Sequence, residues 1–119
     1  MATHSFAYIY TIPDGQTVTG TFAGHPCTWT VSGTVDLTGS WSAPYVKIAH
    51  YKIKLSGPCG DLTFSGLATQ NTDGATYAWD MHVYNLDLKE IPSDEVDPEI
   101  VKSIQLTIIN QFQYYTGDN

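Results

Sequence analysis

Asp80 and His82 are the residues of this sequence whose types and spacing best suit acid–base chemistry. They stand two positions apart in a run from Ala75 to Leu88, where aromatic and aliphatic residues alternate with polar ones. Successive side chains of a β-strand point to opposite faces, so a strand over this run places the carboxylate and the imidazole on one face, within ~7 Å. A carboxylate beside an imidazole fixes its tautomer and raises its basicity, as a general base requires.

A catalytic site built on this pair would also use His50 and Tyr84. Tyr84 lies on the same predicted strand face, and His50 would come from a neighbouring strand. The hypothesis is a small β-barrel that encloses an apolar or aromatic ligand, or a cyclase- or isomerase-like enzyme, and it predicts a closed cavity lined by His82. No nucleophile, zinc-protease or phosphate-loop motif accompanies these residues. A solvated outer strand face is therefore the simpler interpretation, and we favour a protein without catalytic residues.

Four other residues fit ligand binding. Trp41 and Tyr45 stand in or beside an irregular, proline-containing connection, where an exposed ring can stack on the C–H face of a sugar. Asp14 and Asp73 each precede a glycine in a predicted turn, where carboxylates and carbonyls bind hydroxyl groups or calcium. Threonine-rich strand faces add hydroxyl groups. These features favour a non-catalytic, lectin-like domain that binds a glycan or another small molecule, with calcium as a possible cofactor.

The charge balance argues against two classes of partner. The chain of 119 residues carries 12 acidic residues and 5 lysines with no arginine, for a net charge of -7. Proteins that bind nucleic acids or anionic membranes need clustered basic residues. No apolar run approaches the length of a membrane-spanning helix. We therefore expect no nucleic-acid partner and no membrane insertion.

Cys27 and Cys59 both fall in predicted turns and are the candidates for one disulfide. Neither has a nearby histidine at zinc-binding spacing, so a metal site is not expected. A disulfide would place the protein in an oxidising compartment, whereas two free thiols would suit the cytoplasm. The first residues lack the pattern of a signal peptide, which suits an intracellular protein or a mature secreted form preceded by Met1. The abundance of Thr, Ser, Gly and Tyr favours secretion.

Alternation of apolar and polar residues runs through most of the chain and predicts strands. It is cleanest from Thr28 to Leu37, where Trp29, Val31 and Val35 share one face. Turn residues recur at short intervals, and the segment from Ile12 to Gln16 is predicted to close a hairpin. The sequence therefore predicts one domain over residues 1–119, an antiparallel β-sandwich or flattened barrel of six to eight strands.

The last third of the chain predicts one α-helix, at about residues 98–115. Asp97, Pro98 and Glu99 form a helix-start signal, and apolar residues then recur at steps of three and four up to Tyr115. A strand is the alternative, because this segment is rich in β-branched residues that also alternate. An amphipathic helix and exposed strand edges also suit a structural or assembly subunit, so an oligomer is a third hypothesis.

Overall fold

The computed structural model describes residues 5–40, 47–71 and 73–114. Its elements are the strands β1 (Ser5–Thr11), β2 (Thr17–Phe22), β3 (His25–Ser40), β4 (Lys47–Ser56), β5 (Leu62–Gln70), β6 (Tyr77–Tyr84) and β7 (Glu90–Ile91), the short 3₁₀ helix η1 (Ser93–Glu95) and the helix α1 (Pro98–Tyr114). No helix in the described ranges is both long and apolar enough to cross a membrane.

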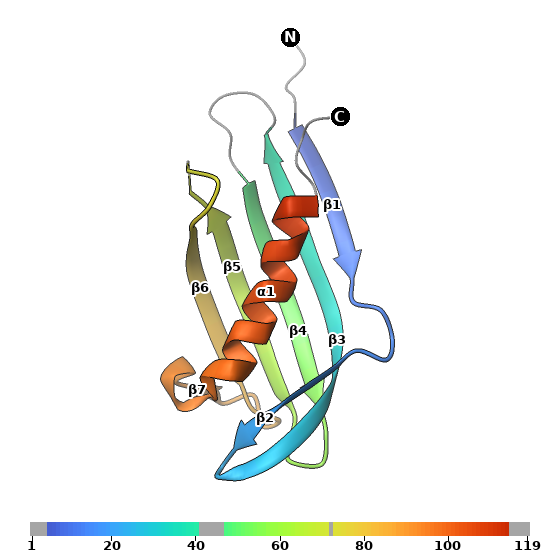
Figure 1. The fold of residues 1–119 in the computed structure, drawn as a ribbon, viewed down its shortest axis with the longest axis vertical. Helices are drawn as coiled ribbons and strands as arrows, with labels where there is room; N and C mark the ends of the chain where they lie inside the picture. The colour runs from blue at the N-terminus through green and yellow to red at the C-terminus, as the bar shows by residue number, and fades with distance from the viewer. Residues whose placement is uncertain (1–4, 41–46, 72, 115–119) are drawn as a thin grey trace.

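The strands form one antiparallel sheet that α1 covers on one face (Figure 1). The sheet order is β1-β3-β4-β5-β6-β7, and β2 also pairs with β3. From β3 to β7 each strand therefore lies beside its predecessor in the chain, as short connections favour. The expected fold class, mainly β and antiparallel with one C-terminal helix, is confirmed.

The segment from Ile12 to Gln16 does not close a hairpin, and that prediction was wrong. Both strands pair with β3: β1 pairs with its second half and β2 with its first half. They lie end to end along one edge of β3, because β3 has 16 residues and is long enough to pair with both. The hairpin lies instead between β2 and β3, where Ala23 and Gly24 have φ values of 54° and 82°, as a two-residue turn with the matching twist requires.

The run predicted as one strand from Ala75 to Leu88 is shorter in the structure. β6 ends at Tyr84, and Asn85 closes a turn by accepting hydrogen bonds through Oδ1 from the backbone N–H groups of Asp87 (2.9 Å) and Lys89 (3.0 Å). The turn leaves the side chain of Leu88 79% exposed, with a positive φ of 60°. Asparagine side chains that bond to nearby backbone stop strands in this way.

The core lies between the inner face of the sheet and the apolar stripe of α1. Trp29, Val35 and Phe64 on the sheet have no exposed surface, and neither have Ile108 and Phe112 on the helix. The predicted helix is confirmed over Pro98–Tyr114. Alternation within the strands and a three-to-four residue step within the helix therefore bring the two apolar faces together.

Two glycines let neighbouring strands approach closely on the inner face. Gly33 and Gly66 have φ values of 129° and 147°, and a Cβ atom on either would collide with the carbonyl oxygen of Lys52 or of Asp80. The Tyr51 hydroxyl uses the space over Gly66 and donates a hydrogen bond of 3.1 Å to the Asp80 carbonyl. Only glycine tolerates this combination of backbone conformation and crowding.

The predicted disulfide is present in the structure. Cys27 and Cys59 are bonded, with their Cα atoms 6.2 Å apart, and the bond ties the β2–β3 hairpin to the turn between β4 and β5. Trp29 supports the same junction, because its indole Nε1 donates a hydrogen bond of 2.9 Å to the Gly60 carbonyl. The β2–β3 hairpin and the β4–β5 turn thus form one cross-linked end of the sheet. The prediction that both cysteines lie in turns was right for Cys59 and wrong for Cys27, which lies in β3.

Candidate functional site

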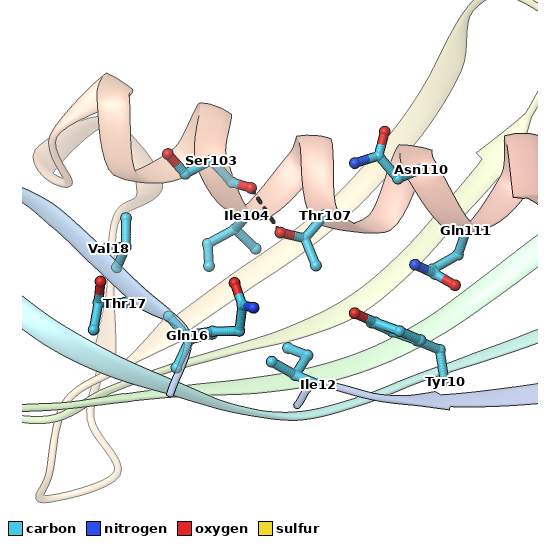
Figure 2. Close-up of a pocket in the computed structure, with 11 residues that line it drawn as sticks. Tyr10, Ile12, Gln16, Thr17, Val18, Ser103, Ile104, Thr107, Asn110 and Gln111 are labelled. Carbon is cyan, nitrogen blue, oxygen red and sulfur yellow. Dashed lines mark hydrogen bonds between the residues drawn. The ribbon is translucent and has the colours of Figure 1, made fainter. Parts of the chain in front are cut away.

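A groove of about 230 Å³ lies between α1 and the two collinear edge strands. Figure 2 shows side chains entering it from the helix on one side and from the edge strands on the other. Its eleven lining residues come from β1, β2, β3, α1 and the segment between β1 and β2. The volume is below the usual range for drug-sized ligands, so the groove suits a small one.

The interruption of the edge strand shapes this groove. Ile12 N–H donates to the Gly33 carbonyl, and Val31 N–H donates to the Gln16 carbonyl, at 3.0 and 2.9 Å. The edge chain therefore advances four residues, from Ile12 to Gln16, along a length over which β3 advances two, from Val31 to Gly33. The two extra residues make the chain bow outward. Because their number is even, the alternation of side chains is preserved, and Ile12 and Gln16 both lie on the inner face. Both side chains consequently line the groove.

Contacts near its first turn fix α1 over the sheet. Asp97 caps the helix by accepting a hydrogen bond of 3.0 Å from the Glu99 N–H, and its other oxygen accepts one of 2.6 Å from the Thr21 N–H on β2. These two bonds lower the pKa of the Asp97 carboxyl, that from Thr21 having the larger effect. Ile100 packs against Gly20, where a Cβ atom would collide. The helix start is thus held close to β2, and the groove opens further along.

The groove is lined by uncharged hydrogen-bonding groups and aliphatic groups. Its polar members are Tyr10, Gln16, Thr17, Ser103, Thr107, Asn110 and Gln111. Its aliphatic members are Ile12, Val18, Val31 and Ile104. No carboxylate, lysine or histidine is among these lining residues. Hydroxyl and amide groups can both donate and accept hydrogen bonds, so the lining matches a ligand with neutral hydroxyl groups and C–H surface.

Gln111 is the most unusual residue of the groove. It is 8% exposed, and its side-chain amide forms no hydrogen bond with another described residue. Figure 2 shows this amide extending from α1 toward Tyr10, while the Gln16 amide extends from the opposite side toward the helix. A buried polar group without a partner destabilises a fold by about 1–3 kcal/mol. A molecule in the groove would supply the hydrogen-bond partner that the Gln111 amide lacks among the described residues.

Asp80 and His82 lie together on the outer face of the sheet, as their spacing predicts. The Nε2 atom of His82 is 3.0 Å from Asp80 Oδ1, and its Nδ1 atom is 2.9 Å from Glu90 Oε2. Carboxylates only accept hydrogen bonds, so the protonated imidazole, which donates from both nitrogens, fits this setting. The hydrogen bond to Glu90 is the main cause, and the charge of Asp80 the second, of a raised His82 pKa.

Of the two other proposed catalytic residues, Tyr84 lies beside this pair and His50 does not. His50 pairs with Leu67 on β5, which in turn pairs with Asp80, so His50 lies two strands away. Tyr84 stacks beside His82, with ring centroids 6.5 Å apart. His82 does not line the groove, and 40% of its side chain is exposed rather than enclosed in a cavity. Among the described residues, no cluster of three His, Cys, Asp or Glu side chains is arranged to hold a metal ion.

Of the residues predicted to bind ligand, the structure describes Asp14 and Asp73, which lie in two different turns. Asp73 closes the turn before β6, because its carboxylate accepts hydrogen bonds of 2.9 Å from the backbone of Ala75 and of Thr76 and one of 2.8 Å from the Thr76 hydroxyl. These bonds, led by the Thr76 backbone, lower the pKa of Asp73. Asp14 lies in the outward bow beside the groove. Trp41 and Tyr45 lie outside the described residues.

Sequence reasoning missed the groove, although Gln111 carried a signal. It stands seven residues after Ile104 and next to Phe112, a position that faces the core in a helix of this periodicity. A polar residue there interrupts the apolar stripe and marks either a buried hydrogen bond or a binding site. Compared with known proteins, the chain matches no family model, no curated protein and no solved structure.

Proposed function

We propose that this protein is a non-catalytic, lectin-like binding domain whose groove takes one small, neutral, hydroxyl-bearing unit such as a single sugar ring. The buried Gln111 amide, without a hydrogen-bond partner among the described residues, carries the proposal. Tyr10 lies beside it and adds both a ring and a hydroxyl group, and Gln16 extends toward the helix further along the groove, near Thr107. Amide groups both donate to and accept from sugar hydroxyl groups, and Ile12 and Ile104 offer apolar surface to the C–H groups.

The charge of the lining supports a neutral ligand. A phosphate or carboxylate ligand would enter a low-dielectric groove without a cation from any of the lining residues to balance it. A ligand with a charged amine would likewise have no carboxylate among the lining residues to balance its charge. For the same reason calcium has no ligand set inside the groove, and we expect binding to be independent of calcium.

The disulfide supports an extracellular site of action. The Cys27–Cys59 bond joins the start of β3 to the turn after β4 at the end of the sheet, and such bonds persist mainly in oxidising compartments. Glycans are abundant outside the cell, so the proposed ligand and the proposed location agree. Titration of thiols in protein freshly isolated from its native source tests the location: two reactive thiols without added reductant would contradict it.

Titration of isotope-labelled protein with neutral monosaccharides and polyols, followed by NMR, tests the proposed ligand. We expect the side-chain amide signals of Gln111 and Gln16 to shift, with affinities of about 1 mM, as suits a small ligand in an open groove. Matched charged sugars, a uronic acid and an amino sugar, should bind more weakly, and a chelator should change nothing. If no neutral sugar moves these signals at about 10 mM, the proposal fails.

A further inference from the structure

Two Asp–Gly dipeptides lie in turns of this chain, Asp14–Gly15 between β1 and β2 and Asp73–Gly74 between β5 and β6. An aspartate before a glycine is open to a reaction of the backbone, because no side chain on the glycine hinders its amide nitrogen from attacking the aspartate Cγ atom. All four residues are exposed. Both glycines have positive φ values, 91° and 72°, with open space where a Cβ atom would lie. The two sites therefore differ in their hydrogen bonds and not in the freedom of their glycines.

The Asp73–Gly74 dipeptide is held by hydrogen bonds on both reacting groups. The Asp73 carboxylate accepts bonds of 2.9, 2.9 and 2.8 Å from the N–H groups of Ala75 and Thr76 and from the Thr76 hydroxyl. The Gly74 N–H donates a bond of 3.0 Å to the Asn71 carbonyl. The bonds to the carboxylate, led by that from the Thr76 backbone, also lower the Asp73 pKa. This carboxyl group consequently seldom carries the proton with which a hydroxyl group leaves as water.

The Asp14–Gly15 dipeptide lacks these restraints. Among the residues that the structure describes, none forms a hydrogen bond or an ion pair with the Asp14 carboxylate, and none accepts a bond from the Gly15 N–H. The dipeptide lies in the outward bow between Ile12 and Gln16, so no strand pairing holds its backbone. Its peptide group is therefore free to rotate until the Gly15 nitrogen lies against Asp14 Cγ.

We propose that Asp14 is a site of spontaneous modification in the folded protein, where the backbone isomerises to isoaspartate, and that Asp73 is protected from the same reaction. The Gly15 nitrogen bonds to Asp14 Cγ and loses its proton, while the protonated carboxyl group loses its hydroxyl, and the two leave as water. The resulting cyclic imide then takes up water at the backbone carbonyl carbon of Asp14, and the bond from that carbon to the Gly15 nitrogen breaks. One water is released and one consumed, so the product has the mass of the original chain.

The bow between β1 and β2 tolerates this product. Isoaspartate lengthens the main chain by one carbon atom, which would disturb the register within a strand pair. The bow is anchored on both sides, by the bond from Ile12 N–H to the Gly33 carbonyl and by that from Val31 N–H to the Gln16 carbonyl. The extra atom enlarges the bow and leaves both anchors in place. The product is therefore a second folded form with a displaced carboxylate at the rim of the groove, whether or not the groove binds a sugar.

Incubation of the folded protein for several weeks at neutral pH and body temperature, followed by peptide mapping with electron-transfer fragmentation, tests the proposal. This fragmentation distinguishes isoaspartate from aspartate of equal mass. We expect isoaspartate to form at position 14 at least about tenfold faster than at position 73, because several hydrogen bonds must open at the second site. In urea-denatured protein the two rates should become similar, because unfolding removes the bonds that protect Asp73.

Two variants separate the sites. Asp14→Glu should abolish the reaction at position 14, because the imide would need a larger and less readily closed ring. Thr76→Val removes the hydroxyl bond to the Asp73 carboxylate and should speed conversion at position 73 alone. Thr76 is exposed, so this variant should fold. In the modified native protein, the N–H groups of Ile12 and Val31 should stay protected from hydrogen exchange, since both anchors persist.

Several results would overturn the proposal. One is equal conversion of Asp14 and Asp73 in the folded protein, and another is a difference in rate that survives denaturation. A third is a folded sample in which Asp14 stays unmodified while the denatured sample converts. Loss of exchange protection at Ile12 and Val31 after modification would show that the bow does not absorb the added atom.

Discussion

His82 Nδ1 lies 2.9 Å from Glu90 Oε2, and this contact joins β6 to the short strand β7 through side chains. The hydrogen bond that His82 donates to Glu90, followed by the charge of Asp80, raises the His82 pKa above 6.5. Because the folded pKa is above the unfolded value, the stabilisation is complete below about pH 6.5 and is lost as the pH rises through the folded pKa. The attachment of β7 therefore weakens toward alkaline pH.

Glu90→Gln should lower the His82 pKa and reduce the loss of stability above neutral pH. An NMR titration of the His82 ring measures the first effect, and thermal unfolding at several pH values measures the second. Glu99→Gln is a matched control, because Glu99 is an exposed acid near the start of α1. A His82 pKa that is unchanged in Glu90→Gln would contradict the role of this contact.

Gln111→Leu should abolish sugar binding while stabilising the fold. The substitution removes a buried amide that lacks a partner, so we expect the free energy of unfolding to rise by about 1 kcal/mol. Chemical denaturation and the NMR titration measure the two effects on one sample. Gln105→Leu on the same helix, outside the groove, should leave binding unchanged. Binding that survives Gln111→Leu would show that Gln111 does not contact the ligand.

Replacing both Cys27 and Cys59 with serine should lower the free energy of unfolding by about 3–4 kcal/mol. The bond closes a loop with a sequence separation of 32, and a loop of this length restricts the unfolded chain by that amount in the entropy model. Denaturation of the native protein with and without reductant should give the same difference. A loss below about 1 kcal/mol would mean that the hydrogen bond from Trp29 to Gly60 suffices to hold this end together.

Leu88→Gly should stabilise the protein. Leu88 has a φ of 60°, a conformation that strains a leucine by about 1–2 kcal/mol and that glycine adopts freely. The greater freedom of glycine in the unfolded chain offsets about 0.4–1 kcal/mol, so a net gain of up to about 1.6 kcal/mol remains. Leu86→Gly, in the same turn, relieves no such strain and should destabilise instead. Equal losses in both variants would contradict this account.

The parts of the fold that depend on local pattern were predictable. The alternation around Trp29, Val31 and Val35 placed these side chains on the inner face, where the structure buries them. Asp97 and Pro98 marked the start of the helix correctly, because capping depends on residues within one turn. Cys27 and Cys59 were the candidates for a disulfide, with two free thiols as the alternative, and the structure bonds them although Cys27 lies in β3 and not in a turn.

The parts that depend on distant partners were not predictable. Pro13, Asp14 and Gly15 carry turn chemistry, but whether the chain reverses or bows depends on the length of β3, which lies beyond the segment itself. In the same way, Asp80 and His82 were correctly predicted to lie on one face. Glu90, which also contacts the His82 ring, was not predicted, because the turn at Asn85 brings β7 beside β6. The groove depends on where α1 crosses the edge strand, which no local pattern specifies.

The division of one edge into β1 and β2 has a consequence for variation of this protein. Each strand is anchored to β3 independently, so the residues from Pro13 to Gly15 can gain or lose an even number of positions without disturbing either anchor. Such length changes would alter the rim of the groove and leave the core intact. New ligand preferences can thus be selected in the segment between β1 and β2, by evolution or by library screening, with little risk to folding.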